Sequence, residues 1–324
     1  MIPPIARQRI SDFQEHVNTI APDLRHLAQA AWNQIDFSKS EPEIIYEFLA
    51  GITSGTGHLN REVAPRLSVN GRIAKFASIF LHQKPLVFGY QSNTPTSQNS
   101  GAACELGDLQ VLFVYADAAK AICQCRSTIF QAKKNRASGD YIIGNAYQRH
   151  LYDQAHGFEY KTVLPGTRRA LPSVWADRER ALQYLFVEAQ PVSARLIPAN
   201  AGAGAFLGFG EFVVRLLNDS SGLAFEAPPT PRLKDWTRIV WDMIEQVAQA
   251  TADHRKTRDS GLYGLLQHFN SFEDRKHFFL EGPPHQASSV DITAGGGIPM
   301  LMVIISDKEL ITERQKLFLH PKHP

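Results

Sequence analysis

Two long β-rich runs around one short polar interruption constrain this chain more than any other feature. The first run is 105–115, the second is 121–134, and the polar segment 117–120 separates them. Such a pattern is typical of an antiparallel hairpin. A hairpin that places Asp108 opposite Gln131 has its turn midway between them, at residues 119 and 120. That position lies inside the interruption, so the pattern predicts that Asp108 and Gln131 meet.

The end of this hairpin brings together three groups with complementary chemistry. Side chains alternate along a strand, so Gln131 and Lys133 share one face and Ala132 lies on the other. A carboxylate and a carbonyl oxygen are hard ligands of the kind that Mg²⁺ takes. A lysine beside them can orient or help to deprotonate an attacking water, or neutralise charge at phosphorus. The set indicates phosphodiester hydrolysis with Mg²⁺ or Mn²⁺ as cofactor.

This Asp…Gln-x-Lys arrangement resembles the active-site signature of the PD-(D/E)XK nuclease superfamily, in the Mrr-like restriction endonuclease branch where Gln replaces an acid. The resemblance covers at most residues 72–188, about a third of the chain. It implies that Asp108 is the metal-binding aspartate, that Gln131 occupies the second ligand position and that Lys133 is the catalytic lysine.

The same resemblance implies a further glutamate, and two residues are candidates for it. Glu62 is a candidate metal ligand by its position in the chain, and Glu105 is a candidate catalytic residue by its closeness to Asp108. On an ideal strand Glu105 faces away from Asp108, because their spacing is odd. A bulge at Gly107 is needed to turn it back.

The whole chain predicts an α/β protein with a central mixed sheet flanked by helices, and the resemblance implies a restriction-endonuclease-like core. Periodicity and capping residues indicate helices over 23–32, 40–50, 70–81, 142–154 and 236–250. Apolar runs indicate further strands at 86–90, 181–187 and 299–305. We expect an N-terminal helical region (1–85), a nuclease core (86–190) and a C-terminal α+β region of unknown role (191–324).

A local excess of positive charge offers a candidate surface for nucleic acid. Between Arg126 and Arg180 there are ten Lys and Arg against five Asp and Glu, although the formal charge of the chain is only +2. Bulk charge therefore does not provide a nucleic-acid interface, and a local cleft is needed. The cations expected to line it are Lys134, Arg136, Arg149, Arg168 and Arg169. A solvated basic face accounts for the excess equally well.

Several other classes of protein fit the sequence poorly. No apolar run approaches the ~20 residues of a membrane-spanning helix, so no membrane association is expected. The N-terminus lacks the features of a secretory signal, and three cysteines do not form a disulfide scaffold, which together favour the cytoplasm. No P-loop and no zinc-binding pattern occurs. The Gly-rich segment 198–210 leaves a small-molecule enzyme as a third hypothesis.

The predicted function is that of a Mg²⁺-dependent nuclease. Its expected substrate is DNA, and its expected role is in restriction or phage defence. Its expected partners are nucleic acid, a second copy of the chain, or another protein of a defence system. The alternative is a catalytically inactive protein that binds nucleic acid or another macromolecule and retains the nuclease fold. Gln131 keeps this alternative open, because an amide in place of an acid removes one formal charge from the metal site.

Overall fold

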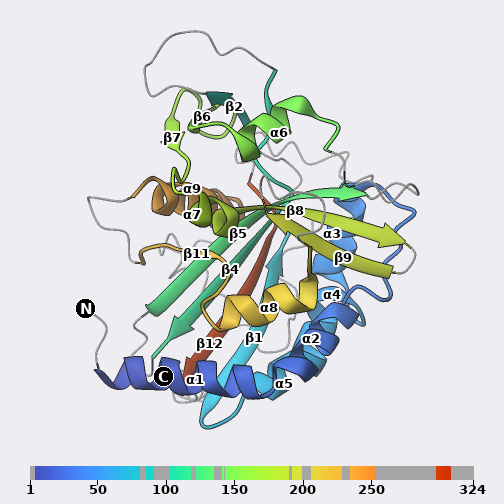
Figure 1. The fold of residues 1–324 in the computed structure, drawn as a ribbon, viewed down its shortest axis with the longest axis vertical. Helices are drawn as coiled ribbons and strands as arrows, with labels where there is room; N and C mark the ends of the chain where they lie inside the picture. Colours follow the sequence, from blue (N-terminus) through green and yellow to red (C-terminus); the bar gives the residue numbers. More distant parts are fainter. Residues whose placement is uncertain are drawn as a thin grey trace, which may run out of the picture.

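The structure is a computed structural model that describes residues 4–80, 85–90, 102–117, 122–134, 141, 143–189, 192–198, 206–227, 234–252 and 297–307. These residues form a mixed eight-stranded sheet, a smaller four-stranded sheet, and helices on both faces of the larger one (Figure 1). The fold is therefore α/β with a central mixed sheet, as the sequence predicts.

The central sheet has the order β1-β12-β4-β5-β8-β9-β10, and β11 pairs with β5. Its strands are β1 (Arg72–Ile79), β4 (Leu109–Ala116), β5 (Ile122–Lys134), β8 (Leu182–Ala189), β9 (Val192–Pro198), β10 (Leu207–Gly208), β11 (Leu223–Ala224) and β12 (Met300–Asp307). The pairs β12–β4 and β5–β8 are parallel, and the others are antiparallel. The sheet is thus mixed at its centre, where the hairpin lies.

Strands β4 and β5 form the hairpin that the sequence predicts. Leu109 lies opposite Phe130 and Tyr115 opposite Gln124, and the register shifts only at Ala116. The backbone N–H of Asp108 donates to the carbonyl of Phe130 at 2.7 Å, so the pairing continues to the residue before β4. Asp108 therefore lies at the hairpin end, level with Gln131.

Two groups of helices cover the two faces of the central sheet. The helices on the first face are α1 (Pro4–Thr19), α2 (Ala21–Ala30), α3 (Glu41–Ala50), the π-helical turn η1 (Leu59–Val63), α5 (Ala64–Leu67) and α8 (Phe209–Leu217), with α4 (Gly55–His58) joining α3 to η1. Those on the second face are α6 (Ala146–Asp153), α7 (Trp175–Ala181) and α9 (Asp235–Ala252). Each group shares an apolar core with one face of the strands, so β4 is buried on both sides.

The smaller sheet has the order β3-β2-β6-β7 and lies on the side of the second helix group (Figure 1). Its strands are β2 (Leu86–Tyr90), β3 (Cys104–Glu105), β6 (Gly157–Tyr160) and β7 (Arg168–Ala170). Arg169 of β7 and Asp242 of α9 form a bidentate ion pair at 2.7 and 2.9 Å, which ties this sheet to α9.

The helix predicted over 70–81 is wrong, because this segment contains strand β1. Its residues Ala74 and Phe76 pack into the core of the first face, whereas Ala77 and Ile79 pack into the core of the second. Burial on both faces removes the polar alternation that identifies a strand, and the remaining apolar spacing imitates a helix. Helix α8 begins at Phe209, within the Gly-rich segment 198–210.

The central sheet draws strands from all three regions that the sequence suggests. Strand β1 comes from the region before residue 86, and β9 and β12 come from the region after residue 190. Strand β12 lies between β1 and β4, antiparallel to the first and parallel to the second. The expected boundaries therefore do not separate independent sheets. In the described part of the chain, no helix is both long and apolar enough to cross a membrane.

Candidate active site

The carboxylate of Asp108 and the amide of Gln131 meet at the end of the hairpin. Gln131 Nε2 donates to Asp108 Oδ2, and the backbone N–H of Ala132 donates to the same oxygen at 2.7 Å. Both side chains are buried, with exposed fractions of 2% for Asp108 and 0% for Gln131. The hairpin register therefore brings the acid and the amide together as the sequence predicts.

The side-chain oxygen of Gln131 is an unsatisfied acceptor. Oε1 is buried and has no hydrogen-bond partner in the described structure. A buried acceptor left without a donor costs about 1–3 kcal/mol. A cation or a water molecule beside the carboxylate of Asp108 would remove this cost, so the position favours an additional bound species.

Lys133 meets a carboxylate that the sequence analysis does not include. Its Nζ lies 3.3 Å from Glu41 Oε2, and the side chains of Lys133 and Glu41 are 17% and 31% exposed. The other oxygen, Glu41 Oε1, accepts the backbone N–H of Lys134 at 3.0 Å. Glu41 therefore provides a hydrogen-bond acceptor and a negative charge for the last two residues of β5, which extend beyond the end of β4.

Local sequence explains why Glu41 occupies this position. Helix α3 begins at Glu41 with Pro42 in its first turn, and Glu43 accepts the backbone N–H of Ser40 at 2.9 Å. The cap and the proline fix the start of the helix. The sequence indicates this helix start, but the contact with Lys133 spans 92 residues and carries no local signal.

The two glutamates expected from the resemblance lie elsewhere. Glu62 is in η1 and pairs with Arg61 at 2.7 Å, and the Arg61 guanidinium lowers the pKa of the Glu62 carboxyl. Glu105 is in β3 and lies opposite Leu86 in the smaller sheet. The carboxylate that contacts Lys133 in this structure is that of Glu41.

Gly107 marks the point where the chain passes from one sheet to the other. A Cβ at this position would lie 2.3 Å from Cγ2 of Ile129, closer than real Cβ contacts allow. Glycine is therefore required beside the hairpin end. The chain does not form the expected bulge at Gly107. It passes here from the smaller sheet to the central sheet, and Glu105 lies in strand β3 of the smaller sheet.

A layer of tyrosines covers Asp108 and Gln131. Tyr152 of α6 donates to the carbonyl of Leu106 at 2.9 Å and stacks on Tyr184, with ring centroids 5.1 Å apart. Tyr184 lies beside Gln131 in the parallel pairing of β5 and β8. Burial raises the pKa of Tyr152 well above its ordinary value, and the nearby charge of Asp108 raises it further. Water is thus largely excluded from this side of the carboxylate.

The described cations expected to bind nucleic acid lie on three different elements, β5, α6 and β7. Lys134 Nζ donates to the carbonyls of Ser38 and Lys39 at 3.2 and 2.9 Å. Arg168 pairs with Glu159 in the smaller sheet at 2.8 Å, and Arg169 pairs with Asp242. The remaining two are Arg149, which is exposed on α6, and Arg136, which lies outside the described residues.

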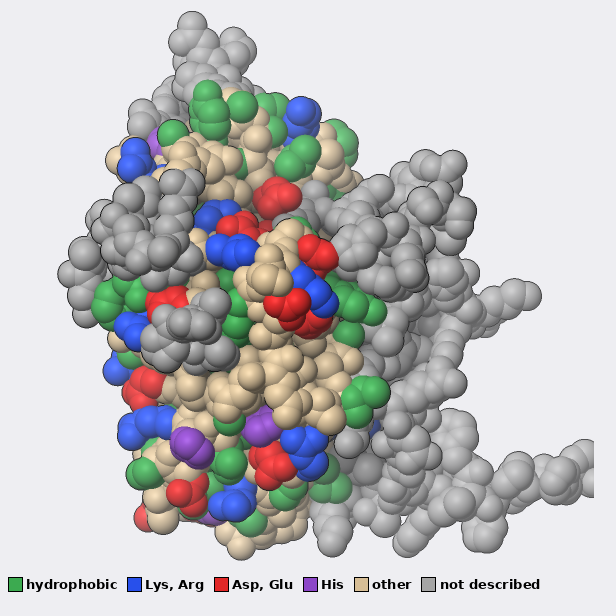
Figure 2. All heavy atoms as spheres, turned by 90° about the vertical axis from the view of Figure 1, so that its right-hand side faces the viewer, with side chains coloured by type: hydrophobic (Ala, Val, Ile, Leu, Met, Phe, Trp, Pro, Cys, Tyr) green, Lys and Arg blue, Asp and Glu red, His purple; other side chains and the backbone are tan. Residues whose placement is uncertain are grey.

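Acidic and basic side chains are mixed on the face at the right-hand side of Figure 1, towards which α3 and the ends of β8 and β9 lie (Figure 2). The ion pairs of these elements likewise place a basic side chain beside an acidic one. Lys39, which precedes α3, pairs with Glu47, which lies within that helix. Arg195 of β9 lies 3.7 Å from Glu188 of β8. The visible part of this face therefore lacks a field of one sign.

The donor types at the hairpin end are those that hard divalent cations take. Within the described ranges, no cluster of three or more His, Cys, Asp or Glu side chains could hold a metal ion. Mg²⁺ does not require such a cluster, because it commonly takes one or two carboxylates and keeps several waters. Asp108 and the unsatisfied oxygen of Gln131 supply one carboxylate and one carbonyl oxygen, and Glu41 supplies a carboxylate beside Lys133.

No family model matches this chain, and comparisons with curated proteins and with solved structures find no match either.

Proposed function

We propose that this protein is a metal-dependent nuclease with a restriction-endonuclease-like core and that its substrate is DNA. The observation that carries the proposal is the hairpin end. There a buried carboxylate lies against an amide whose oxygen lacks a partner, and a lysine held by a second carboxylate follows two residues later. The residue types and their order agree with the resemblance found in the sequence.

Each residue has a role that follows from its chemistry. Asp108 and Gln131 Oε1 would hold Mg²⁺ or Mn²⁺, and Glu41 would supply a carboxylate beside Lys133. Such an ion, when bound, polarises the phosphate and lowers the pKa of a coordinated water. The ammonium of Lys133 orients the attacking water or neutralises charge on the phosphate oxygens, and Glu41 holds that ammonium at the strand end.

Burial determines how a substrate can reach this site. Asp108 and Gln131 are almost completely buried, whereas Lys133 and Glu41 keep contact with solvent. A phosphate therefore approaches from the side of Lys133 and Glu41. The amide of Gln131 must also turn away from Asp108, so that both of their oxygens face the cation.

The test is cleavage of single-stranded, duplex and modified DNA, and of RNA, by the purified protein. Cleavage is expected with Mg²⁺ or Mn²⁺ and is expected to cease with EDTA. Asp108→Asn and Lys133→Ala should each reduce it by about 100-fold or more, the effect typical of losing charge stabilisation in the transition state. Lys39→Ala is the matched control, because Lys39 also pairs with a glutamate of α3. Cleavage that survives both substitutions contradicts the proposal.

One observation favours a second candidate function, a non-catalytic protein that binds nucleic acid or another macromolecule. Asp108 is buried and already accepts hydrogen bonds from Gln131 and Ala132, an arrangement that also suits a purely structural carboxylate. Nucleic-acid binding that persists in EDTA, with no cleavage in either metal on any of these substrates, selects this second function.

A place in restriction or phage defence, a cytoplasmic location, and assembly with a second copy or a defence-system protein belong to the proposal by analogy with the resembled branch. The defence role is tested after cleavage is established, by phage challenge of cells that carry the wild-type protein or the Lys133→Ala variant.

A further inference from the structure

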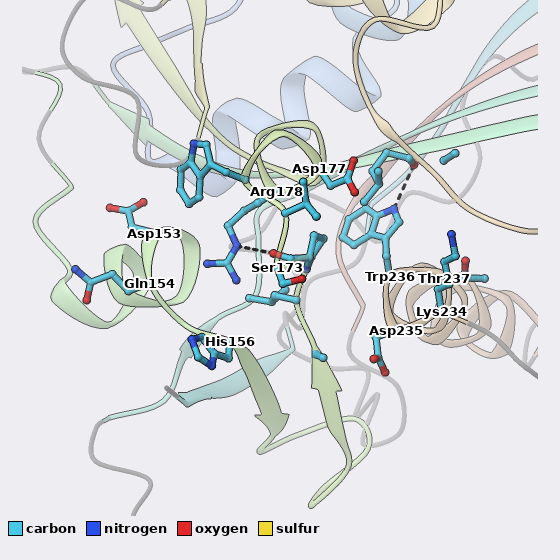
Figure 3. Close-up of a pocket in the computed structure, with 17 residues that line it drawn as sticks. Asp153, Gln154, His156, Ser173, Asp177, Arg178, Lys234, Asp235, Trp236 and Thr237 are labelled. Atoms are coloured by element: carbon cyan, nitrogen blue, oxygen red, sulfur yellow. Dashed lines mark hydrogen bonds between the residues drawn. The ribbon is translucent and has the colours of Figure 1, made fainter. Parts of the chain in front are cut away.

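A pocket of about 830 Å³ lies away from the hairpin end, between α6, α7 and α9. Figure 3 shows side chains from three parts of the chain around it: Asp153 and His156 from the end of α6 and the segment after it, Arg178 from α7, and Trp236 from α9. Its volume falls within the roughly 300–1,000 Å³ of small-molecule sites. Its lining combines aromatic rings, cations and carboxylates.

Two indole rings form fixed walls of this pocket. Trp175 Nε1 donates to Glu179 at 2.8 Å, and Trp236 Nε1 donates to the carbonyl of Leu223 at 3.2 Å. Trp175 is 37% exposed, so part of its ring is open to a ligand, whereas Trp236 is 5% exposed. Rings held through their N–H groups lose little entropy when a flat partner stacks on them.

Arg178 provides a buried cation with an incomplete set of partners. Its Nε donates to the carbonyl of Pro172 at 3.2 Å, and Nη2 donates to the carbonyl of Ala155. Nη1 has no hydrogen-bond partner among the described residues, although the side chain is 5% exposed and lines the pocket. Burial lowers the pKa of the guanidinium, and only the nearby charge of Asp153 acts in the opposite direction. An anionic group of a ligand would complete this environment.

The remaining charged groups define the type of ligand. Lys234 is an exposed second cation on the pocket wall, and Asp177 and Asp235 are carboxylates that can accept hydrogen bonds. A ligand with a flat ring, hydroxyl or amino donors and an anionic group matches these three kinds of partner. An organic cation fits less well, because the buried charged group on the pocket wall, Arg178, is itself a cation.

We propose that this pocket binds a nucleotide, with the base against Trp175 and the phosphate at Arg178. The nucleotide is either free or part of a nucleic-acid strand. The pocket also connects to the hairpin end, because Asp153 on its wall accepts the hydroxyl of Tyr184 at 3.0 Å and Tyr184 lies beside Gln131. Nucleotide binding here does not depend on the proposed nuclease activity.

The test is titration calorimetry of the full chain in EDTA, so that no metal-dependent cleavage takes part. The probes are the four ribonucleoside and four deoxyribonucleoside monophosphates, the matching nucleosides, inorganic phosphate, a ten-residue single-stranded DNA, its RNA equivalent and a lysine-rich peptide. At least one monophosphate or single strand is expected to bind. Binding of monophosphates points to a free nucleotide, and binding of the strands alone points to a nucleotide within a strand.

Matched variants show whether binding takes place in the pocket. Trp175→Ala is expected to weaken binding about tenfold, the effect of losing one stacked base, whereas Trp175→Phe retains most of it. Tyr147→Ala removes an exposed aromatic ring that does not line the pocket and should leave binding unchanged. Arg178→Gln should weaken binding of the nucleotide and leave that of the nucleoside as it was.

Three results would overturn the proposal: no binding by any nucleotide or strand, binding that is indifferent to Trp175→Ala, or a preference for the lysine-rich peptide. Failure of the cleavage test leaves this result intact, and failure here leaves the roles of Asp108 and Lys133 intact.

Discussion

One carboxylate, that of Glu41, connects the first turn of α3 to the end of β5. It accepts the backbone N–H of Lys134 through one oxygen and contacts the ammonium of Lys133 through the other. The backbone contact requires only an acceptor, whereas the contact with Lys133 also uses the negative charge. These two roles can therefore be separated by a substitution that keeps the shape of the side chain and removes its charge.

We expect Glu41→Gln to reduce cleavage by about 10- to 100-fold, as loss of a partner that positions an active-site group typically does. The amide oxygen still accepts the N–H of Lys134, so the melting temperature should change little. Glu47→Gln is the control, because Glu47 also lies on α3 and pairs with a lysine, Lys39. Initial cleavage rates measure the effect. Equal losses in both variants would show that Glu41 has no special relation to Lys133.

At the scale of elements, the attachment of α9 to the smaller sheet depends on a polar contact as well as on apolar packing. Arg169 and Asp242 are 16% and 10% exposed, and the hydroxyl of Tyr160 donates to the same carboxylate at 3.1 Å. Such a pair contributes through its complete hydrogen bonding, and removal of one partner leaves a charge that is mostly buried.

Asp242→Ala is expected to lower the free energy of unfolding by about 3 kcal/mol, because Arg169 then keeps a desolvated charge without its partner. The double variant Arg169→Met with Asp242→Leu should lose less, since both charges are removed. Arg168→Ala breaks the neighbouring, more exposed pair with Glu159 and should cost less than about 1 kcal/mol. Urea unfolding followed by circular dichroism gives the three values. A double variant less stable than Asp242→Ala contradicts this account.

At the scale of the whole molecule, the second face of the central sheet buries several groups that ionise at alkaline pH. Burial raises the pKa of the Cys104 thiol to about 11 and raises those of the tyrosines Tyr152, Tyr160 and Tyr184 above their ordinary value. All four belong to the core beneath α6, α7 and α9. They are neutral in the folded protein and ionise more readily in the unfolded chain.

The folded protein should therefore lose stability as the pH rises. A raised folded-state pKa contributes stability that is complete below the unfolded value of about 9–10 and is lost as the pH rises through the folded value. The urea midpoint should be constant from about pH 7 to 8.5 and fall steadily above about pH 9, and the tyrosinate absorbance of these three tyrosines should appear only on unfolding. Tyrosinate absorbance that rises to its full value before the chain unfolds would show that these tyrosines are not buried.

The sequence by itself determined those features whose causes are local. Alternation and the polar interruption predict the register of β4 and β5, and this register places Asp108 beside Gln131. Ser40 and Pro42 predict the start of α3. In each case the interacting residues belong to one hairpin or one helix end, so short-range geometry is sufficient.

Only the tertiary structure decided the remaining features. Strand β1 lost its recognisable pattern because two cores cover it, and β12 entered the sheet between β1 and β4 from the far end of the sequence. The contact of Glu41 with Lys133 and the pocket beside Arg178 also join segments far apart in the chain. Sequence periodicity records which residues are apolar, but the choice of partner depends on how the whole chain packs, and no local pattern specifies it.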